Sequence, residues 1–378
     1  MTGAGHGTRS AEVLAALAGV IDPEIRRPIT ELGMIGGVTV DEAGKATVAL
    51  KLTIVGCPAA DTIERDVREA AASVDGINSV LVEVTVMTKD ERAALTETLR
   101  GGRARTLQFG PDSLTRVYAI TSGKGGVGKS TIAANLAVAL AERGLSVGIV
   151  DADVFGFSIP GILGLEGAKP TQVDQMILPP IGHGVKVISI GMFVDGNAAV
   201  SWRGPILHRT IQQFLSDVFF GDLDVLLLDL PPGTGDIALS LGQLLPQAEV
   251  IVVTTPQPAA AEVAERSGLV ARQMGQKVIG VIENMSGALQ DDGSLLEIFG
   301  SGGGAEVAAR LSRGQDEPVP VLASIPISLQ TRISGDAGTP IVLSSPSDPA
   351  ALALSTVADG LVSRRRGLAG RKLGVSVR

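Results

Sequence analysis

Short apolar runs recur along the chain after residue 114, and longer amphipathic segments separate them. The runs cover residues 117–120, 147–150, 225–228, 250–253, 278–282 and 319–322. Continuous apolar strands that alternate with helices are typical of a parallel sheet covered by helices on both faces. The pattern therefore predicts an α/β fold with a mostly parallel sheet in this part of the chain.

The first 90 residues follow a different pattern, which predicts a small α+β domain. Apolar residues at helical spacing after Ser10 predict a helix over residues 10–20. Two β-rich runs at 37–40 and 46–53 flank a turn of polar and small residues. A helix over residues 58–73 and a strand over residues 79–87 complete the expected unit.

Between these two parts the chain becomes polar and its hydrophobic periodicity fades. We expect a small domain at 1–90, a linker at 91–113, a parallel-sheet domain at 114–361 and a basic tail at 362–378. From Arg364 onward the tail has six Lys and Arg residues and no acidic residue. It is either a solvated chain end or a weak contact site for an anionic surface.

The composition excludes several classes of protein. With 378 residues, 45% of them hydrophobic and 19% charged, the chain is long enough for two domains and can bury a large core. A net charge of -8 and few aromatic residues (8 Phe, 1 Trp, 1 Tyr) argue against a general nucleic-acid binder. No apolar run reaches the roughly 20 residues of a membrane-spanning helix. The short apolar stretch at 13–21 is preceded by Glu12 and followed by Asp22-Pro23-Glu24, so we interpret it as a helix and not as a signal peptide. We expect a cytoplasmic protein with no specific nucleic-acid partner and no membrane span.

Cys57 is the one cysteine of the sequence. A single thiol excludes an intrachain disulfide and a four-cysteine zinc or iron–sulfur site held by one chain. Any such thiolate site must take ligands from more than one chain. The three histidines are scattered along the sequence, and we assign none of them to a metal.

A phosphate-binding loop is the strongest chemical signal. The segment Gly123-Lys124-Gly125-Gly126-Val127-Gly128-Lys129-Ser130 matches G-x-x-x-x-G-K-[ST] between a predicted strand and a predicted helix. Glycines let such a loop wrap its N–H groups around phosphate oxygens, and the helix N-terminus adds a partial positive charge. Lys129 would neutralise the β- and γ-phosphates, and Ser130 would ligate Mg²⁺. We expect residues 123–130, together with Thr131, to bind ATP with Mg²⁺.

Lys124 is a second lysine inside this loop, and an ordinary phosphate loop does not need it. The string from Lys124 to Thr131 resembles the deviant Walker A motif of the MinD/ParA/ArsA/nitrogenase-iron-protein superfamily. The resemblance implies a homodimer in which Lys124 acts on the partner's ATP. A cation donated only in the closed dimer would stabilise charge on the transferring phosphoryl group. The alternative is a loop lysine that faces solvent.

Three aspartates follow two of the predicted strands: Asp151 and Asp153 after residues 147–150, and Asp229 after residues 225–228. In open α/β sheets ligands bind at the carboxyl ends of strands, so these acids should lie beside the phosphate loop. Asp229 would anchor Mg²⁺ through water, Asp151 would support the metal shell, and Asp153 would orient or deprotonate the attacking water. A helix-capping role is the alternative for each acid.

Five motifs that follow in order narrow the resemblance. Residues 151–160, 202–205, 213–215, 230–236 and 283–286 together resemble the Mrp/ApbC group of iron–sulfur cluster carrier ATPases. The likeness extends over about residues 115 to 360 and implies that Asn284 recognises the nucleotide base. An amide suits that role because it donates and accepts hydrogen bonds at a purine edge. Asn284 alone could equally be a C-cap.

The sequence departs from this group after Asn284. Cluster-binding members carry a C-x-x-C pair several residues further on, where this chain reads Gly287-Ala288-Leu289-Gln290-Asp291-Asp292-Gly293-Ser294. Neither Gln290 nor Gly293 can replace a soft sulfur ligand. This half of the chain therefore lacks the expected thiolates for a cluster.

Motifs in the first half offer a partial replacement. Residues 22–24, 31–35 and 53–58 resemble the small domain of iron–sulfur assembly factors that is often fused in front of Mrp-type ATPases. Cys57 precedes Pro58 and a predicted helix, whose N-terminus could stabilise the thiolate and make it reactive. A buried, inert cysteine is the alternative. Two chains would supply two such thiolates, which form only part of a cluster's ligand shell.

The resemblance implies a homodimeric ATPase that carries or assembles iron–sulfur clusters, with apo iron–sulfur proteins or cluster donors as partners. Its cofactors would be ATP and Mg²⁺, with Lys124, Lys129 and Asp153 as catalytic residues and an iron–sulfur cluster at Cys57 as a further candidate. Two alternatives remain open. One is a MinD/ParA-like positioning ATPase, and the other is an ATP-dependent assembly scaffold that holds no cluster itself.

Overall fold

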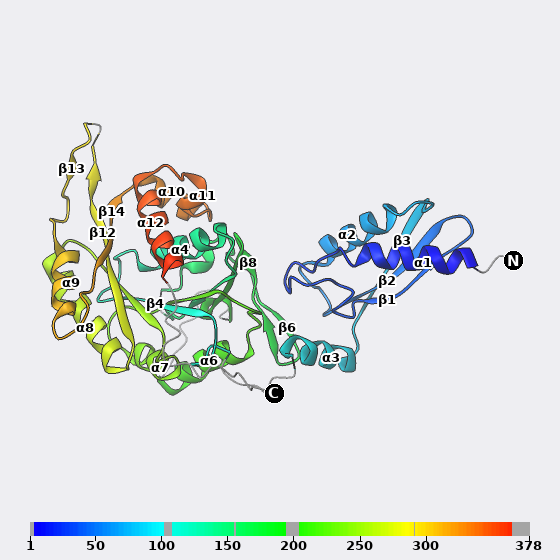
Figure 1. Cartoon of the computed structure of the whole chain (residues 1–378), viewed down its shortest axis with the longest axis horizontal. Helices are drawn as coiled ribbons and strands as arrows, with labels where there is room; N and C mark the ends of the chain where they lie inside the picture. Colours follow the sequence, from blue (N-terminus) through cyan, green and yellow to red (C-terminus); the bar gives the residue numbers. More distant parts are fainter. Residues whose placement is uncertain (1–3, 102–107, 155, 194–203, 291, 365–378) are drawn as a thin grey trace, which may run out of the picture.

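The computed structural model describes residues 4–101, 108–154, 156–193, 204–290 and 292–364. Within these ranges the chain forms a three-stranded sheet near its start, a nine-stranded sheet in the remainder and a two-stranded hairpin. Figure 1 shows the two larger sheets in two bodies that lie side by side. The predicted α/β fold with a preceding small α+β unit is confirmed.

The small body contains two helices and three strands. Its elements are α1 (Ala4–Leu17), β1 (Ile35–Val40), β2 (Lys45–Leu52), α2 (Ala60–Ala72) and β3 (Ser79–Val86). Strand β2 lies in the centre, antiparallel to β1 and parallel to β3. Alternate residues of β2, including Val48 and Leu50, are fully buried with Val13 and Leu17 of α1. The first helix begins at Ala4, several residues before the predicted start at Ser10.

The segment that we expected to be a linker begins with a helix. Helix α3 (Lys89–Arg100) starts with a capping box, in which the Thr88 hydroxyl accepts from the Glu91 N–H and the Glu91 carboxylate accepts from the Thr88 N–H. Such reciprocal caps satisfy N–H groups that have no partner within the helix. Leu95 is buried against the small body. The polarity of this segment concealed the helix, because its apolar stripe is short.

The large body is built around a twisted, mostly parallel sheet. Its parallel strands are β4 (Arg116–Ser122), β5 (Val147–Asp151), β9 (Val185–Ser189), β10 (Val225–Asp229), β11 (Glu249–Thr254), β12 (Lys277–Leu289) and β14 (Val321–Ile327). Short antiparallel strands, β8 (Ile181–Gly182) and β13 (Leu295–Leu296), lie at the two ends of the strand order, and β14 also pairs with β12. The strand expected at 319–322 begins two residues later and is longer than expected.

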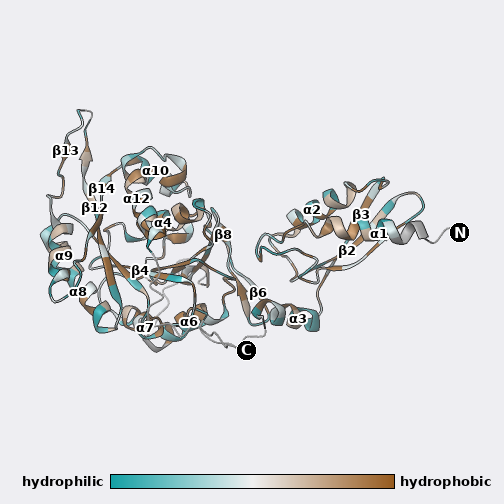
Figure 2. Ribbon diagram, viewed as in Figure 1, coloured by the Kyte–Doolittle hydropathy of each residue, from teal (hydrophilic) through white to brown (hydrophobic). Residues whose placement is uncertain are grey.

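Helices cover both faces of this sheet, as the continuous apolar strands predict. One face packs against α6 (Gly204–Asp217), α7 (Asp236–Leu244), α8 (Pro258–Gln273) and α9 (Gly303–Ser312). The other face packs against α4 (Lys129–Glu142), α11 (Ile341–Ser344) and α12 (Pro349–Ser363), with α10 (Leu329–Asp336) beside α11. Strand residues alternate between the two cores, so that Val117 and Ala119 face one core and Tyr118 and Ile120 the other. Figure 2 shows the hydrophobic residues concentrated along these strands.

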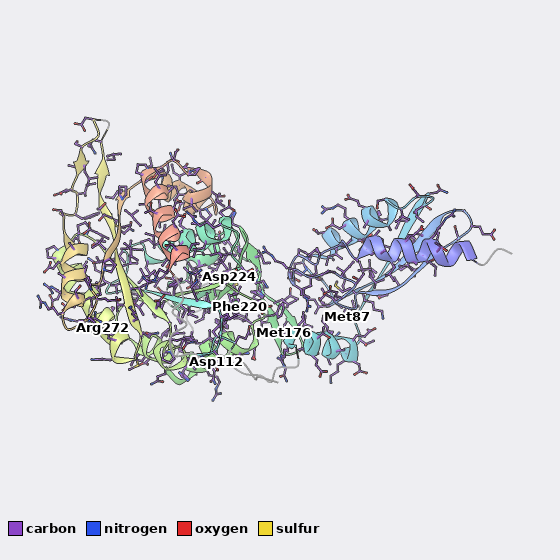
Figure 3. The ribbon with its side chains drawn as sticks, in the orientation of Figure 1. Met87, Asp112, Met176, Phe220, Asp224 and Arg272 are labelled. Atoms are coloured by element: carbon purple, nitrogen blue, oxygen red, sulfur yellow. The ribbon has the colours of Figure 1, made fainter. Side chains whose placement is uncertain are left out.

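A small hairpin of the large body packs into the core of the small body. It consists of β6 (Thr171–Val173) and β7 (Met176–Leu178), which follow the short helix α5 (Ile159–Ile162). Met176, labelled at this junction in Figure 3, and its neighbours Val173 and Leu178 are buried among small-body residues. Hydrophobic burial at this hairpin therefore ties the two bodies together.

Some predictions concern residues outside the described ranges. Residues 202–203 of one family-like motif and residues 365–378 of the basic tail are among them. Within the ranges that the structure describes, no helix has both the length and the apolar character needed to cross a membrane.

Candidate nucleotide site

The phosphate loop connects the end of β4 to the start of α4 at the carboxyl edge of the large sheet. Gly126 and Gly128 have φ angles of 79° and 80°, a conformation that residues with a Cβ rarely adopt. A Cβ on Gly123 would lie 2.3 Å from the backbone of α8, and one on Gly128 would lie 2.2 Å from the Asn284 amide nitrogen. The glycines are therefore required by backbone shape and by close packing around the loop.

Asp229 is the point at which the loop is attached to the sheet. Its carboxylate ends β10 and is fully buried. Lys129 Nζ donates to Asp229 Oδ1 at 2.5 Å, and Ser130 Oγ donates to Asp229 Oδ2 at 2.5 Å. The first residues of α4 thus satisfy both oxygens of a carboxylate that would otherwise be buried without a partner.

Asp151 lies beside Asp229 in the sheet, since the two residues are register partners on β5 and β10. Its carboxylate accepts hydrogen bonds from Ser189 Oγ at 3.0 Å and from the Asp153 and Ile159 N–H groups at 3.1 and 3.4 Å. Burial, and then repulsion by Asp229, raises the pKa of Asp151 to about 8. Burial also raises the pKa of Asp229. A cation bound beside these two adjacent buried carboxyls would stabilise their ionised forms.

Asp153 faces the cavity above the loop. It is nearly buried, and its Oδ2 lies 3.9 Å from Lys129 Nζ. The cavity has a volume of about 640 Å³ and is lined by residues 124–131 of the loop together with Asp153, Pro231, Pro232 and Asp236. Neither Asp151 nor Asp229 lines it, so these two acids lie beneath the surface on which Asp153 is presented.

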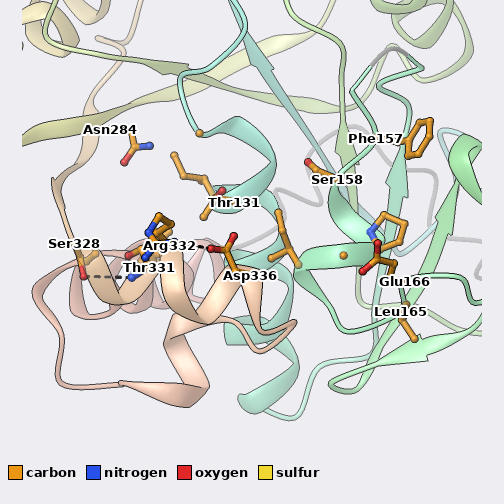
Figure 4. Close-up of a pocket in the computed structure, with 18 of the residues that line it drawn as sticks. Thr131, Phe157, Ser158, Leu165, Glu166, Asn284, Ser328, Thr331, Arg332 and Asp336 are labelled. Atoms are coloured by element: carbon orange, nitrogen blue, oxygen red, sulfur yellow. Dashed lines mark hydrogen bonds and ion pairs between the residues drawn. The ribbon is translucent and has the colours of Figure 1, made fainter. Parts of the chain in front are cut away.

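A second cavity of about 790 Å³ adjoins the first and shares Gly128, Thr131 and Ser158 with it. Asn284 lies on its wall, where Asn284 Nδ2 donates to the Val127 carbonyl of the loop at 2.8 Å. Figure 4 shows Asn284 and Thr131 on one side of this cavity and Phe157 and Glu166 on the other. The two cavities provide adjoining spaces for the phosphates and for the nucleoside of one nucleotide.

Sequence reasoning did not find one part of the wall of the second cavity. Ser328, Thr331, Arg332 and Asp336 line it, and Arg332 forms an ion pair with Asp336 at 2.9 Å. They come from α10 and the residue before it, which follow β14. Their place after a strand end was the one available signal, and no motif singled them out.

Lys124 lines the first cavity and is held within its own chain. Its Nζ donates to Gln257 Oε1 at 2.9 Å, and Gln257 is the residue that precedes α8. The lysine is therefore not a free loop side chain in a single copy of the protein. Its action on a partner's nucleotide would require it to exchange Gln257 for a new acceptor.

Cys57 lies in the small body, among the residues of that body's core. Burial raises the pKa of its thiol, and the neighbouring Glu24 and Asp22 carboxyls add to the rise, although a hydrogen bond from the Ala59 N–H opposes it. The expectation of a thiolate stabilised by the helix N-terminus is therefore wrong, because desolvation outweighs that hydrogen bond. Thiol chemistry at Cys57 requires a change in its surroundings.

The acids near Cys57 stabilise the local fold. Asp22 Oδ1 accepts from the Glu24 and Ile25 N–H groups at 2.9 and 2.7 Å and so closes a turn. Glu24 accepts a hydrogen bond from Thr171 of the β6–β7 hairpin at 2.8 Å. Across the described parts of the chain, no group of three or more His, Cys, Asp or Glu residues is arranged to hold a metal ion.

The described residues of the segment that replaces C-x-x-C lie at the end of β12 and between β12 and β13. Gln290 N donates to the Ser294 carbonyl at 2.8 Å, and Gly293 has a φ of 82° that the turn requires. Figure 1 shows this hairpin projecting from the large body. It exposes large apolar side chains, namely Leu289, Leu295, Leu296 and Ile298.

Comparisons with known proteins agree with both halves of the chain. The family described as NUBPL iron-transfer P-loop NTPase matches residues 113–362, and the family described as iron–sulfur cluster assembly protein matches residues 10–84. The iron–sulfur cluster carrier protein of Mycobacterium tuberculosis is 54% identical over 377 residues, which cover 99% of each chain. The protein of the same name from Synechocystis is 38% identical, with 93% of this chain and 96% of that protein covered.

A solved structure resembles the large body. It is the nucleotide-binding protein from Archaeoglobus fulgidus in complex with ADP, which is 35% identical and has a TM-score of 0.53. The match covers 62% of this chain and 92% of that chain.

We expect Lys129→Ala to reduce ATP turnover at least about 100-fold, because it removes the cation that faces the phosphates and leaves the Asp229 carboxylate short of a partner. Steady-state phosphate release measures the effect. Lys277→Ala is the matched control, since Lys277 forms an exposed ion pair with Glu317 far from the loop. Undiminished turnover by Lys129→Ala would contradict the assignment of the site.

The pKa of the Asp151 carboxyl is about 8 in the folded chain and 3.8 in the unfolded chain. Between these pH values the folded chain therefore holds a proton that the unfolded chain has lost. For nucleotide-free and metal-free protein, the free energy of unfolding should therefore fall as the pH rises between these values. Asp151→Asn should make this dependence smaller. Urea unfolding at pH 6, 7 and 8 measures it, with the exposed Asp359→Asn as control. Equal slopes for Asp151→Asn and wild type would show that Asp151 is ionised in the fold.

Proposed function

The chain belongs to the NUBPL-type family of iron-transfer P-loop NTPases, and from this premise we propose that it carries or assembles iron–sulfur clusters in a cycle driven by ATP. Its relatives named as iron–sulfur cluster carrier proteins match it over nearly their whole length. The observation that carries the ATPase part is the convergence of Lys129, Ser130 and Asp229 beneath a cavity of nucleotide size. We further propose that hydrolysis is slow and coupled to the conformation of a dimer.

The reaction would be an in-line attack of water on the γ-phosphate. Lys129 would turn from Asp229 towards the phosphates and offset their charge, while the N–H groups at the start of α4 receive phosphate oxygens. Asp153 faces the cavity and would orient the water or take its proton. Asp151 acts indirectly, since it accepts from the Asp153 N–H and so fixes the loop that carries Asp153.

The residues beneath the cavity fit Mg²⁺. Ser130 Oγ and Asp229 Oδ2 are oxygen donors that already lie 2.5 Å apart, and hard oxygen donors are what this ion prefers. Ser130 would hold the ion directly, and Asp229 would hold it through water, with Asp151 supporting that shell from the neighbouring strand. When bound, the ion would neutralise charge that develops on the phosphates.

A homodimer would complete the site, with Lys124 of each chain serving the partner's nucleotide. Lys124 reaches the cavity from the loop and is held by the neutral acceptor Gln257, so that an anionic phosphate is a stronger competitor for it. The β12–β13 hairpin supports the same proposal. Its apolar residues are exposed at the edge of the sheet, where β13 has one neighbour strand, and such surfaces favour association.

Cluster binding is the least supported part of the cycle within one chain. Cys57 is buried with a raised pKa, and the β12–β13 turn offers Gln290 and Gly293 where thiolates would be needed. These observations favour a second candidate function, an ATP-dependent assembly scaffold that holds no cluster itself. In both cases the partners would be apo iron–sulfur proteins or cluster donors, and we place the protein in the cytoplasm.

A charged residue introduced on the β12–β13 hairpin tests whether this hairpin lies in the dimer interface. Leu296→Asp should weaken ATP-dependent dimerisation at least tenfold, because it places a carboxylate in an apolar contact. Leu352→Asp on α12 is the matched control, since both leucines are 54% exposed. Sedimentation velocity with and without ATP measures the mass. A dimer of unchanged strength in Leu296→Asp would remove the hairpin from the interface.

The choice between carrier and scaffold is tested by anaerobic reconstitution with iron and sulfide. If the protein is a carrier, the wild-type dimer should retain bound iron and sulfide and transfer them to an apo-acceptor. The Cys57→Ala dimer should then lose most of its bound iron and sulfide. A scaffold should retain none and still accelerate transfer from a separate donor in the presence of ATP. Equal cluster content in wild type and Cys57→Ala would exclude Cys57 as a ligand.

A further inference from the structure

We propose that a cleft between the two bodies binds a small oxyanion that carries at least two negative charges. The cleft has a volume of about 630 Å³ and is separate from both cavities of the nucleotide site. Residues of both bodies line it. Four of them are cations, namely Arg26, Arg27, Arg100 and Lys186, and two are acids, Asp217 and Asp222.

Arg26 is presented to the cleft by an unusual backbone. Its φ is 60°, a left-handed conformation that costs free energy for a residue with a long side chain. Hydrogen bonds on both sides hold the turn: Arg26 N donates to the Asp22 carbonyl at 2.8 Å, and Asp22 N donates to the Arg27 carbonyl at 3.0 Å. Among the described residues Arg26 forms no ion pair. The turn thus holds a cation at the cleft without supplying its counterion.

Lys186 approaches from the large body and is buried. Its Nζ donates to the Phe220 carbonyl at 2.9 Å and lies 5.0 Å from the centre of the Phe219 ring. Burial, and then repulsion by Arg26, lowers the pKa of this amine to about 8. Arg26 and Lys186 line the same cleft from different bodies, and an anion bound there would relieve both the repulsion between them and the desolvation of the amine.

Arg100 adds a third cation, with an unsatisfied donor, at the end of α3. Its Nη2 atom is buried and has no hydrogen-bond partner. A buried guanidinium N–H without an acceptor is costly, and it matches an oxygen of a ligand. Arg27 already forms an ion pair, in which its Nη2 lies 3.5 Å from Glu31 Oε2. We therefore assign the ligand chiefly to the other three cations.

Four cations against two acids leave the described lining of the cleft with a net positive charge. Asp217 is buried and accepts from Ser216 Oγ at 3.0 Å, and Asp222 lies on the exposed rim. Both Arg and Lys donors suit phosphate and carboxylate groups, and arginine can bind either in a bidentate manner. A compact ligand such as a diphosphate or a tricarboxylate suits this charge, and the cleft is large enough to admit it with water.

The test uses the full-length chain without Mg²⁺ and saturated with ADP, so that the phosphate loop is occupied. Inorganic pyrophosphate and citrate are titrated separately by calorimetry, which also distinguishes phosphate from carboxylate ligands. We expect one site per chain for at least one probe. Arg26→Ala and Lys186→Met should each weaken its binding at least tenfold, while Arg65→Ala, which removes an exposed arginine of α2, should not.

Arg26→Ala keeps the test decisive if Lys186→Met unfolds, because Arg26 is exposed and its removal leaves the buried contacts intact. The proposal is overturned if neither probe binds. It is also overturned if binding is equally strong in Arg26→Ala, or if the probe binds only by displacing ADP. None of these results depends on iron, sulfide or ATP hydrolysis, so the cleft is tested independently of the proposed carrier function.

Discussion

The buried carboxylate of Asp229 is the constraint on which the nucleotide site depends. A carboxylate with no exposed surface is stable only when it is neutralised and hydrogen-bonded, and here Lys129 and Ser130 do both. Because Asp229 ends the central strand β10, this contact fixes the phosphate loop relative to the sheet. Without a nucleotide, these contacts hold the loop in place. When a nucleotide and its cation bind, Lys129 and Ser130 would exchange Asp229 for the phosphates and the cation.

The sheet and this loop were predictable from the sequence because local signals specify them. Continuous apolar strands such as 225–228 predict burial on both faces, and the glycines and Lys129 predict the phosphate loop. Elements that depend on contacts distant in sequence were not predictable. The β6–β7 hairpin is too short to carry a periodic pattern, and it is stabilised by burial of Met176 in another body.

The behaviour of Cys57 shows why a local rule failed. Its position before a helix predicts a lowered pKa, but this prediction takes no account of the tertiary environment. In the fold the thiol is packed among apolar residues and lies near two carboxyls, Asp22 and Glu24, all of which favour the neutral form. Reactivity would therefore depend on opening of the small body rather than on the thiol's position alone. A partner or a change at the junction could supply that opening.

The turn at residues 22–27 brings these features together. Asp22 and Glu24 of this turn lie near the Cys57 thiol. The Glu24 carboxylate also accepts a hydrogen bond from Thr171, and the Arg26 side chain lines the cleft between the two bodies. Thr171 belongs to a hairpin that begins fewer than 20 residues after Asp153 in the nucleotide cavity. A shift of that segment on nucleotide binding would act directly on the Glu24 contact, and therefore on the charge beside Cys57. The contact between Thr171 and Glu24 is thus the point at which the segment that follows Asp153 meets the surroundings of Cys57.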